Sequence, residues 1–313
     1  MEENKETLHI YTIGSDKSKL ENLEYTSRIA GLNIHVTQVD NWTGYINKIT
    51  KMIEILENEP PDNIVGFVDA YDVLSFAKEE EILKKFKEYN CEILLSSELN
   101  CYPPKFQNEY DEISTQMQSI ELQYKYTNNN VNCETHPPFI ISTNFKYVNS
   151  GGYIGYAKSI LQMLKWKSIE KITEICLDGG DQSYFNYYYL KNAIPSMISF
   201  LNGDKLHIQI DYKQTIFQSM YRINFTDFYF INGRLYNSIL HSKPCFAHFN
   251  GYKIYDDKIM SLDTETAENV YEVFIKNIIS SFIQWDTKHP LNYRVLYYLF
   301  YNGKYQFNLP QIK

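Results

Sequence analysis

Short apolar runs and amphipathic stretches alternate along the first hundred residues, and this order constrains the fold more than any other feature. Apolar residues recur at helical spacing from Ile46 to Leu56, and Pro60-Pro61 then stop that helix. The stretch from Glu79 to Tyr89 reads as a second helix. The runs that read as strands are Leu8 to Ile13, Ile34 to Val39, Ile64 to Val68 and Glu92 to Ser96. Strands that alternate with helices predict an α/β fold, with a Rossmann-like, mostly parallel central sheet flanked by helices.

Composition excludes several other classes of protein. The chain has 313 residues, of which 44% are hydrophobic, so it is long enough to bury a large core without disulfide bonds. Its 13 Gly and 10 Pro are too few for a collagen-like or disordered chain. The net charge of -8 argues against nucleic-acid binding. The five cysteines are scattered without a Cys-x-x-Cys pair, so we expect free thiols and no zinc site.

Neither targeting nor membrane insertion is indicated. The first six residues, Met1 to Glu6, are charged and polar and do not resemble a secretory signal. No run approaches the roughly 18 apolar residues that a membrane span needs. We therefore expect a soluble protein without a membrane span, cytoplasmic by default.

The rest of the chain suggests a polar insertion and a C-terminal extension. Residues 103–143 are polar and lack a clear period apart from a helix near Ile113 to Tyr126, so they read as an insertion or lid. Further helices are expected at 160–166 and 182–190, and further strands at 206–210, 228–231 and 245–249. Residues 255–313 read as a helical extension, which either packs on the first domain or forms a homodimer interface.

The strongest local signal is the segment from Phe67 to Val73, which places Asp69 and Asp72 where an apolar strand ends. In parallel α/β sheets, ligands bind at the carboxyl ends of the strands. Two carboxylates there repel each other unless a cation lies between them, and Mg²⁺ or Mn²⁺ prefers such oxygen ligands. The pair could equally cap the turn and helix that follow. This motif alone leaves both readings open.

A second segment, Tyr147 to Gly155, carries Asn149 and Ser150 before the paired glycines Gly151 and Gly152. Glycines inside an apolar run let a ligand approach the backbone closely, and the two polar side chains suit hydroxyl groups. The alternative is a tight turn or a bulge.

Two further segments carry polar residues at the ends of expected elements. Asp178 and Asp181 flank two glycines just before a predicted helix, where acids are also favoured by the helix dipole alone. His248 ends a predicted strand, and a lone histidine in such a place is usually structural.

Taken in order, these segments resemble the glycosyltransferase domain of the procollagen lysyl hydroxylase family, from about Leu8 to Lys253. Phe67 to Val73 resembles the family's metal-binding Asp-x-x-Asp segment, and Tyr147 to Gly155 resembles its Asn-Ser-Gly-Gly stretch. The further matching segments are Leu94 to Pro103, Asp181-Gln182, Asp211 to Gln218 and His248 to Gly251. The resemblance implies a GT-A type domain over residues 1–254, without the family's hydroxylase domain.

The resemblance also implies a role for individual residues. Asp69, Asp72 and His248 would hold Mn²⁺. The residues implied to bind the UDP-glucose donor are Thr12, Ser15, Tyr71, Ser150, Gly151, Gly251 and Lys253. The residues implied in catalysis are Asp181, Asn149 and Asn250, and those implied at the acceptor side are Glu98, Tyr102 and Asp178.

The implied reaction is transfer of glucose from UDP-glucose to galactosyl-hydroxylysine of collagen or a collagen-like protein, with retention of configuration. Two alternatives stay open: a collagen hydroxylysine galactosyltransferase that uses UDP-galactose, or a non-catalytic module that binds collagen or glycans. Animal members of the family work in the endoplasmic reticulum, whereas this sequence carries no recognisable signal for that route.

Overall fold

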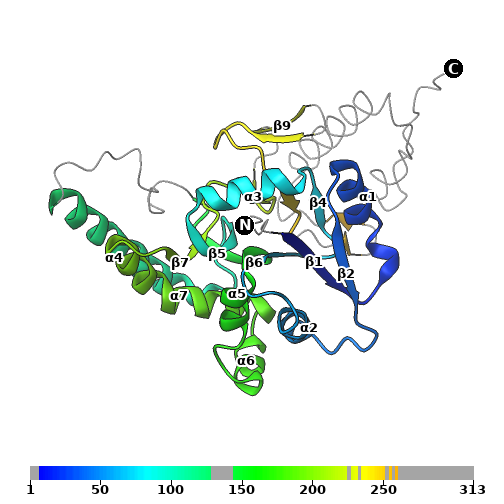
Figure 1. The fold of residues 1–313 in the computed structure, drawn as a ribbon, viewed down its shortest axis with the longest axis horizontal. Helices are drawn as coiled ribbons and strands as arrows, with labels where there is room; N and C mark the ends of the chain where they lie inside the picture. The colour runs from blue at the N-terminus through cyan, green and yellow to red at the C-terminus, as the bar shows by residue number, and fades with distance from the viewer. Residues whose placement is uncertain are drawn as a thin grey trace, which may run out of the picture.

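The computed structural model describes residues 7–127, 144–223, 227–231 and 234–250, together with two short paired strands at Ile254–Tyr255 and Lys258–Ile259. A six-stranded sheet forms its centre (Figure 1). The strands are β1 (Leu8–Gly14), β2 (Ile34–Gln38), β3 (Ile64–Val68), β5 (Cys91–Glu98), β6 (Tyr147–Tyr156) and β7 (Leu206–Ile210). The predicted α/β fold is confirmed. Of the expected helical extension over 255–313, the two short paired strands are described, and residues 260–313 lie outside the described residues.

The sheet is mixed. Its order is β2-β1-β3-β6-β5-β7, and β6 runs antiparallel to both of its neighbours while the other pairs are parallel. The predicted mostly parallel sheet therefore holds for every strand except β6. Nine of the ten β6 residues are buried, so an alternating pattern that would reveal its face or direction is missing from its sequence.

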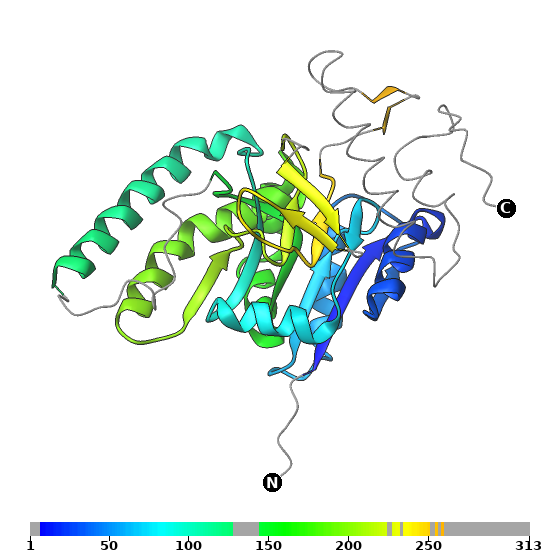
Figure 2. The same ribbon diagram turned by 90° about the horizontal axis from the view of Figure 1, so that it is seen from above.

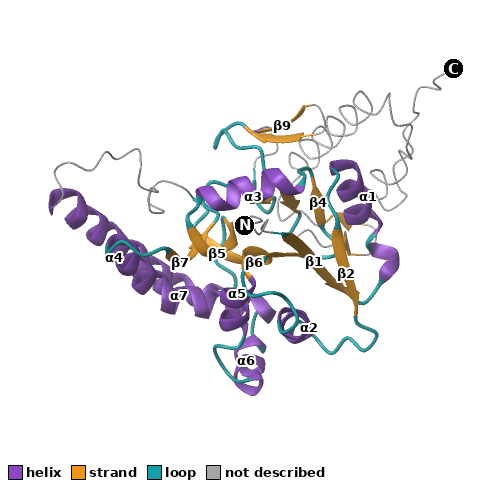
Figure 3. Ribbon diagram, in the orientation of Figure 1, coloured by secondary structure: helices purple, strands orange, loops and turns teal. Residues whose placement is uncertain are grey.

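Helices cover both faces of the sheet (Figure 3). On one face lie α1 (Glu21–Ala30) and α3 (Glu79–Glu88). On the other lie α2 (Ile46–Leu56), α5 (Ala157–Leu164), α6 (Ile169–Cys176) and α7 (Gly180–Leu201). The apolar face that predicted α2 is buried through Ile49, Met52 and Leu56, as the spacing required. No helix in the described part of the chain is both long enough and apolar enough to cross a membrane.

The helix predicted near Ile113 to Tyr126 within the polar insertion is confirmed and begins earlier than expected. After a single turn at Pro104–Phe106, α4 spans Gln107–Thr127 and lies beside α7 (Figure 2). The Tyr110 hydroxyl donates to Asn186 Oδ1 of α7 at 2.5 Å and accepts from the Val148 amide at 2.9 Å. Among the α4 side chains that the structure describes, few are buried, so this stretch carries only a weak helical period. Residues 128–143 of the expected insertion lie outside the described residues.

A second, three-stranded sheet lies next to the first and has the order β4-β11-β8. Its strands are β4 (Val73–Ser75), β11 (Phe246–His248) and β8 (Phe217–Ser219), and a hairpin of β9 (Phe228–Ile231) and β10 (Arg234–Asn237) follows β8 in the chain. His248 pairs with Val73 on one side and with Ser219 on the other. This small sheet therefore brings a residue from the end of the described chain next to the Asp69–Asp72 segment.

Candidate active site and metal centre

Asp69, Asp72 and His248 form a compact group with one ligand atom each, and these atoms all lie within 4.8 Å of one another. His248 Nε2 is 3.2 Å from Asp72 Oδ2 and 3.6 Å from Asp69 Oδ2. The backbone fixes this arrangement, because the Phe249 amide donates to the Asp72 carbonyl at 2.8 Å. The open choice between a metal pair and a capping pair is thus resolved towards a group that could hold a divalent ion.

Asn149 sets the orientation of the histidine. Its Oδ1 accepts from the Gly151 amide at 2.9 Å and lies 3.0 Å from His248 Nδ1. Because an amide oxygen can only accept, Nδ1 carries the proton in this contact, and Nε2 is left facing the two carboxylates. An orienting hydrogen bond of this kind on the second ring nitrogen is typical of histidines that bind metals.

The paired glycines form a bulge in β6 rather than a tight turn. Leu95 of β5 pairs with Tyr153, but the next residue, Ser96, pairs with Asn149, so residues 150–152 are left out of that ladder. A Cβ atom on Gly151 would lie 2.1 Å from His248 Cε1 and 2.8 Å from Asp69 Oδ2. Glycine is therefore required here for the two candidate ligands to approach the strand. The bulge reading is confirmed, and the side chains that approach the strand here are His248 and Asp69, whereas the approach of a ligand stays a prediction.

A lysine that the sequence analysis did not single out joins this group. Lys48 of α2 lies with its Nζ 2.5 Å from Asp69 Oδ1 and 3.3 Å from Asp181 Oδ2. Its side chain is 12% exposed and also lies over the Tyr45 ring. Burial alone would lower the pKa of Lys48, but the Asp181 and Asp69 carboxylates outweigh burial and raise it. Lys48 is consequently a protonated, nearly buried cation.

The sequence could have indicated Lys48 through its position in the predicted helix. It precedes the buried Met52 by four residues and therefore lies on the apolar side of an amphipathic helix. A lysine at such a position calls for a buried carboxylate partner.

Asp181 lies at the start of α7, where the sequence analysis expected a helix, and is 5% exposed. Burial raises the pKa of its carboxyl group, whereas Lys48 and a hydrogen bond from Ser150 oppose that shift. Asp181 and Ser150 thus lie together beside the candidate metal group.

Glu98 is buried at the end of β5 and is held by three side-chain amides. Its Oε1 accepts from Asn149 at 3.1 Å and from Gln182 at 2.5 Å, while Oε2 accepts from Asn250 at 3.0 Å. Burial raises the pKa of Glu98, and the amide hydrogen bonds oppose this rise. Gln182, which was noted only as part of a motif, therefore contributes directly to the site.

Burial would raise the pKa of Asp72 as well, but His248 and Lys48 outweigh burial and lower it. Burial would in turn lower the pKa of His248, but Asp72 and Asp69 raise it above its usual value of 6.5. The pKa of the acid is lowered and the pKa of the base is raised, which is the pattern of an ion pair whose charged forms stabilise each other.

The end of β1 brings together the residues expected at the nucleotide. The Tyr71 hydroxyl accepts from the Ser15 amide at 2.6 Å and from the Asp16 amide at 2.8 Å. Thr12 is fully buried, and its Oγ1 has no hydrogen-bond partner within the described part of the chain. An unpaired buried hydroxyl of this kind suits a site that a polar ligand completes.

The residues expected at the acceptor side are less closely grouped. Tyr102 is 54% exposed at the rim, and its carbonyl accepts from Gln182 and Asn186. Asp178 points to the surface and pairs with Lys105 at 3.0 Å, so the structure does not bring its carboxylate into the cluster. Gly251 and Lys253 lie outside the described residues.

Two observations show that these residues fit a divalent ion: the types of ligand atom they offer, and the absence of a side chain at Gly151. Two carboxylates and an imidazole nitrogen that gives up its proton to bind the ion suit Mn²⁺ or Mg²⁺, and Gly151 leaves the ligand atoms unobstructed. A mixed α/β sheet with such a group at the ends of its strands is consistent with a GT-A-like glycosyltransferase domain.

Comparison with known proteins gives the family. The PLOD GT domain, the glycosyltransferase domain of the procollagen lysyl hydroxylases, matches residues 15–128 and 124–260, and the chain belongs to this family. Uncharacterized protein R699 of Acanthamoeba polyphaga mimivirus is 27% identical over 232 residues, which are 74% of this chain and 40% of that protein. A multifunctional procollagen lysine hydroxylase and glycosyltransferase of Caenorhabditis elegans is 25% identical over 262 residues, 78% of this chain and 30% of its own. The human enzyme LH3, which has the same description, is 27% identical over 161 residues, 51% of this chain and 16% of its own. The chain thus spans less than half the length of these relatives.

Proposed function

We propose that this domain transfers glucose from UDP-glucose to galactosyl-hydroxylysine of collagen or a collagen-like protein, with Mn²⁺ as its metal and with retention of configuration. The observation that carries the proposal is the convergence of Asp69, Asp72 and His248 within a chain of the PLOD GT family. The names of LH3 and of the Caenorhabditis relative supply the acceptor class, because both describe a procollagen lysine hydroxylase and glycosyltransferase.

Asp69, Asp72 and His248 would hold the ion, which when bound would stabilise negative charge on the UDP leaving group as a Lewis acid. Asp181 is held beside this group and would face the donor sugar, where a carboxylate stabilises positive charge that develops at the anomeric carbon. Thr12, Ser15 and Tyr71 would complete the nucleotide side.

The acceptor would approach over Glu98 and Tyr102. Glu98 is buried and fixed by three amides, so it would keep the side chains of Asn149, Gln182 and Asn250 in place beneath the acceptor. Tyr102 offers an exposed aromatic face at the rim, which suits a sugar ring. The presence of both aspartates together with His248 supports an enzyme over a binding module, since a module that only binds has no need of a metal centre.

The test is a UDP-release assay with Mn²⁺ that crosses UDP-glucose and UDP-galactose with collagen peptides carrying hydroxylysine or galactosyl-hydroxylysine. We expect turnover with UDP-glucose and the galactosylated peptide. Turnover only with UDP-galactose and bare hydroxylysine would replace the proposal with the galactosyltransferase alternative. Peptide binding without turnover in any combination would favour the non-catalytic module.

A further inference from the structure

Lys48 occupies an unusual position, because one ammonium group contacts carboxylates from two different elements. Its Nζ lies 2.5 Å from Asp69 Oδ1, just past the end of β3, and 3.3 Å from Asp181 Oδ2 in the first turn of α7. Asp69 belongs to the candidate metal group and Asp181 does not. Lys48 is therefore a direct physical link between the metal group and the carboxylate beside it.

The two oxygens of Asp69 have different neighbours. Oδ1 is engaged by Lys48, whereas Oδ2 lies 3.6 Å from His248 Nε2 on the side of the other candidate ligands. A carboxylate held in this way presents one oxygen to an ion, although carboxylates can also bind a cation with both. Lys48 thus determines how Asp69 is presented.

Lys48 also changes the charge that an incoming ion meets. The carboxylates around it are those of Asp69, Asp72 and Asp181, and the ammonium group offsets one of these three negative charges. A divalent cation must share Asp69 with a positive group that is already in contact with it. Repulsion between like charges at such distances is strong in a partly buried site.

We infer that Lys48 is a positioning residue that competes with the metal ion for Asp69 while holding Asp181 in place. The inference rests on the proposed metal-dependent transfer and adds a consequence to it. The protein without nucleotide binds its ion weakly, and the diphosphate of the donor supplies the negative charge that Lys48 offsets. Metal and donor therefore bind in a mutually dependent way.

A purely structural lysine would behave differently. If Lys48 served only to neutralise buried carboxylates, its loss would destabilise the fold and weaken metal binding and turnover together. Competition instead predicts that loss of Lys48 strengthens metal binding while it lowers turnover. The two possible roles of Lys48 can therefore be separated by experiment.

The experiment compares Lys48→Met and Lys48→Gln with Lys48→Arg in the full chain, with Lys51→Met as a matched control. Lys51 lies one turn further along the same helix and pairs with Glu54 at the surface. Mn²⁺ is titrated into each metal-free protein, with and without UDP, and free Mn²⁺ is followed by its electron paramagnetic resonance signal. Folding is checked by circular dichroism, and UDP release is measured separately.

Without UDP, we expect Lys48→Met and Lys48→Gln to bind Mn²⁺ about tenfold more tightly than the parent protein. UDP release should fall about 100-fold in the same variants, because Asp181 loses its partner. Lys48→Arg, which keeps the charge, should retain the parent affinity and regain part of the turnover. Lys51→Met should match the parent in both.

Unchanged or weaker Mn²⁺ binding by folded Lys48→Met and Lys48→Gln would overturn the inference. Failure of both variants to fold would also overturn it, because Lys48 would then be structural. The Mn²⁺ titration requires neither donor sugar nor acceptor. An incorrect glucosyltransferase assignment would therefore leave this result intact, whereas a parent protein that binds no Mn²⁺ with or without UDP would refute the metal centre itself.

Discussion

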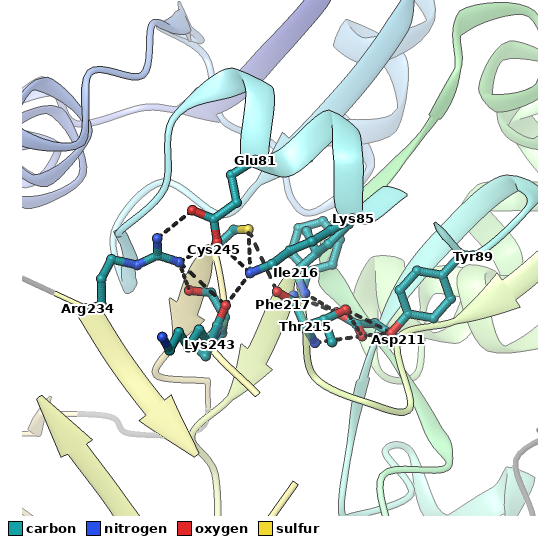
Figure 4. A network of polar contacts seen from close by, with 11 residues as sticks. Glu81, Lys85, Tyr89, Asp211, Thr215, Ile216, Phe217, Arg234, Lys243 and Cys245 are labelled. Atoms are coloured by element: carbon teal, nitrogen blue, oxygen red, sulfur yellow. Dashed lines mark hydrogen bonds and ion pairs between the residues drawn. The ribbon is translucent and has the colours of Figure 1, made fainter. Parts of the chain in front are cut away.

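Two buried carboxylates follow strands of the same sheet, and their surroundings differ sharply. Asp211 comes directly after β7 and accepts from the backbone amides of Thr215, Ile216 and Phe217 at 2.7 to 2.9 Å, and from the Tyr89 hydroxyl (Figure 4). Asp69 comes directly after β3, and its side chain contacts Lys48 from another element and lies near His248 from a second sheet. Asp211 is thus satisfied by three amides of its own loop and one hydroxyl, all neutral donors, whereas Asp69 depends on cationic groups brought from a distance.

This difference separates a structural carboxylate from a candidate metal ligand. Neutral donors that surround Asp211 close the 211–217 connection and leave no room for a ligand. At Asp69, Lys48 engages only Oδ1, and Oδ2 stays directed towards the other candidate ligands, where an ion could bind. The predictions that follow change one side of this comparison at a time.

The largest effect is expected from Asp72→Asn. The variant keeps the shape of the side chain but loses a charged candidate ligand, so UDP release should fall about 1,000-fold or more. Stability should also fall, because His248 and Lys48 lower the pKa of Asp72 and its charged form therefore stabilises the fold. Steady-state kinetics and a urea titration measure the two properties. A variant with parental turnover would refute the metal centre.

Asp211→Asn should have the opposite profile. An amide in place of the carboxylate turns an NH₂ group toward backbone N–H donors, and we expect the free energy of unfolding to fall by about 3 kcal/mol. The folded fraction should keep its Mn²⁺ affinity, because Asp211 contacts none of the three candidate ligands. A urea titration measures the loss. A stable variant that had lost Mn²⁺ binding would mean that Asp211 serves the metal group and not the fold.

The sequence sets Asp69 apart from Asp211 only through the second acid, Asp72, since each aspartate follows an apolar strand. Strands β1, β3 and β7 and helix α2 are predictable because their apolar spacing directly reflects burial. The direction of β6 and the partners of Lys48 are not, since both depend on contacts between segments far apart in the chain. The likeness to a family supplied the role of His248, for which the local sequence gave only a structural reading.

Two neighbouring glycines of β6 allow a finer comparison. Gly151→Ala would place a methyl group against His248 and Asp69, whereas Gly152→Ala would place one 2.6 Å from the Phe217 ring in the core. We expect Gly151→Ala to weaken Mn²⁺ binding at least about tenfold, because the ligands must move apart. Gly152→Ala should lower stability by about 1–3 kcal/mol and leave the ligands in place. Equal effects of both variants on Mn²⁺ binding would mean that the bulge acts only through the fold.

The smallest effect is expected at the charged cluster on α3, which is structural like Asp211 but ionic like the candidate site. Glu81 pairs with both Arg234 and Lys85 at the surface end of the small sheet (Figure 4). Burial alone would raise the pKa of Glu81, but these two partners lower it to about 2.

A lowered folded-state pKa means that the stabilising contribution of Glu81 is present above the usual value of 4.5 and is lost as pH falls from there to about 2. Because Glu81 is partly exposed, we expect a gap of about 1 kcal/mol between the parent protein and Glu81→Gln at neutral pH. Urea titrations across this pH range should show the gap closing. A gap that stayed constant down to pH 2 would mean that shape, and not charge, holds α3 against β10.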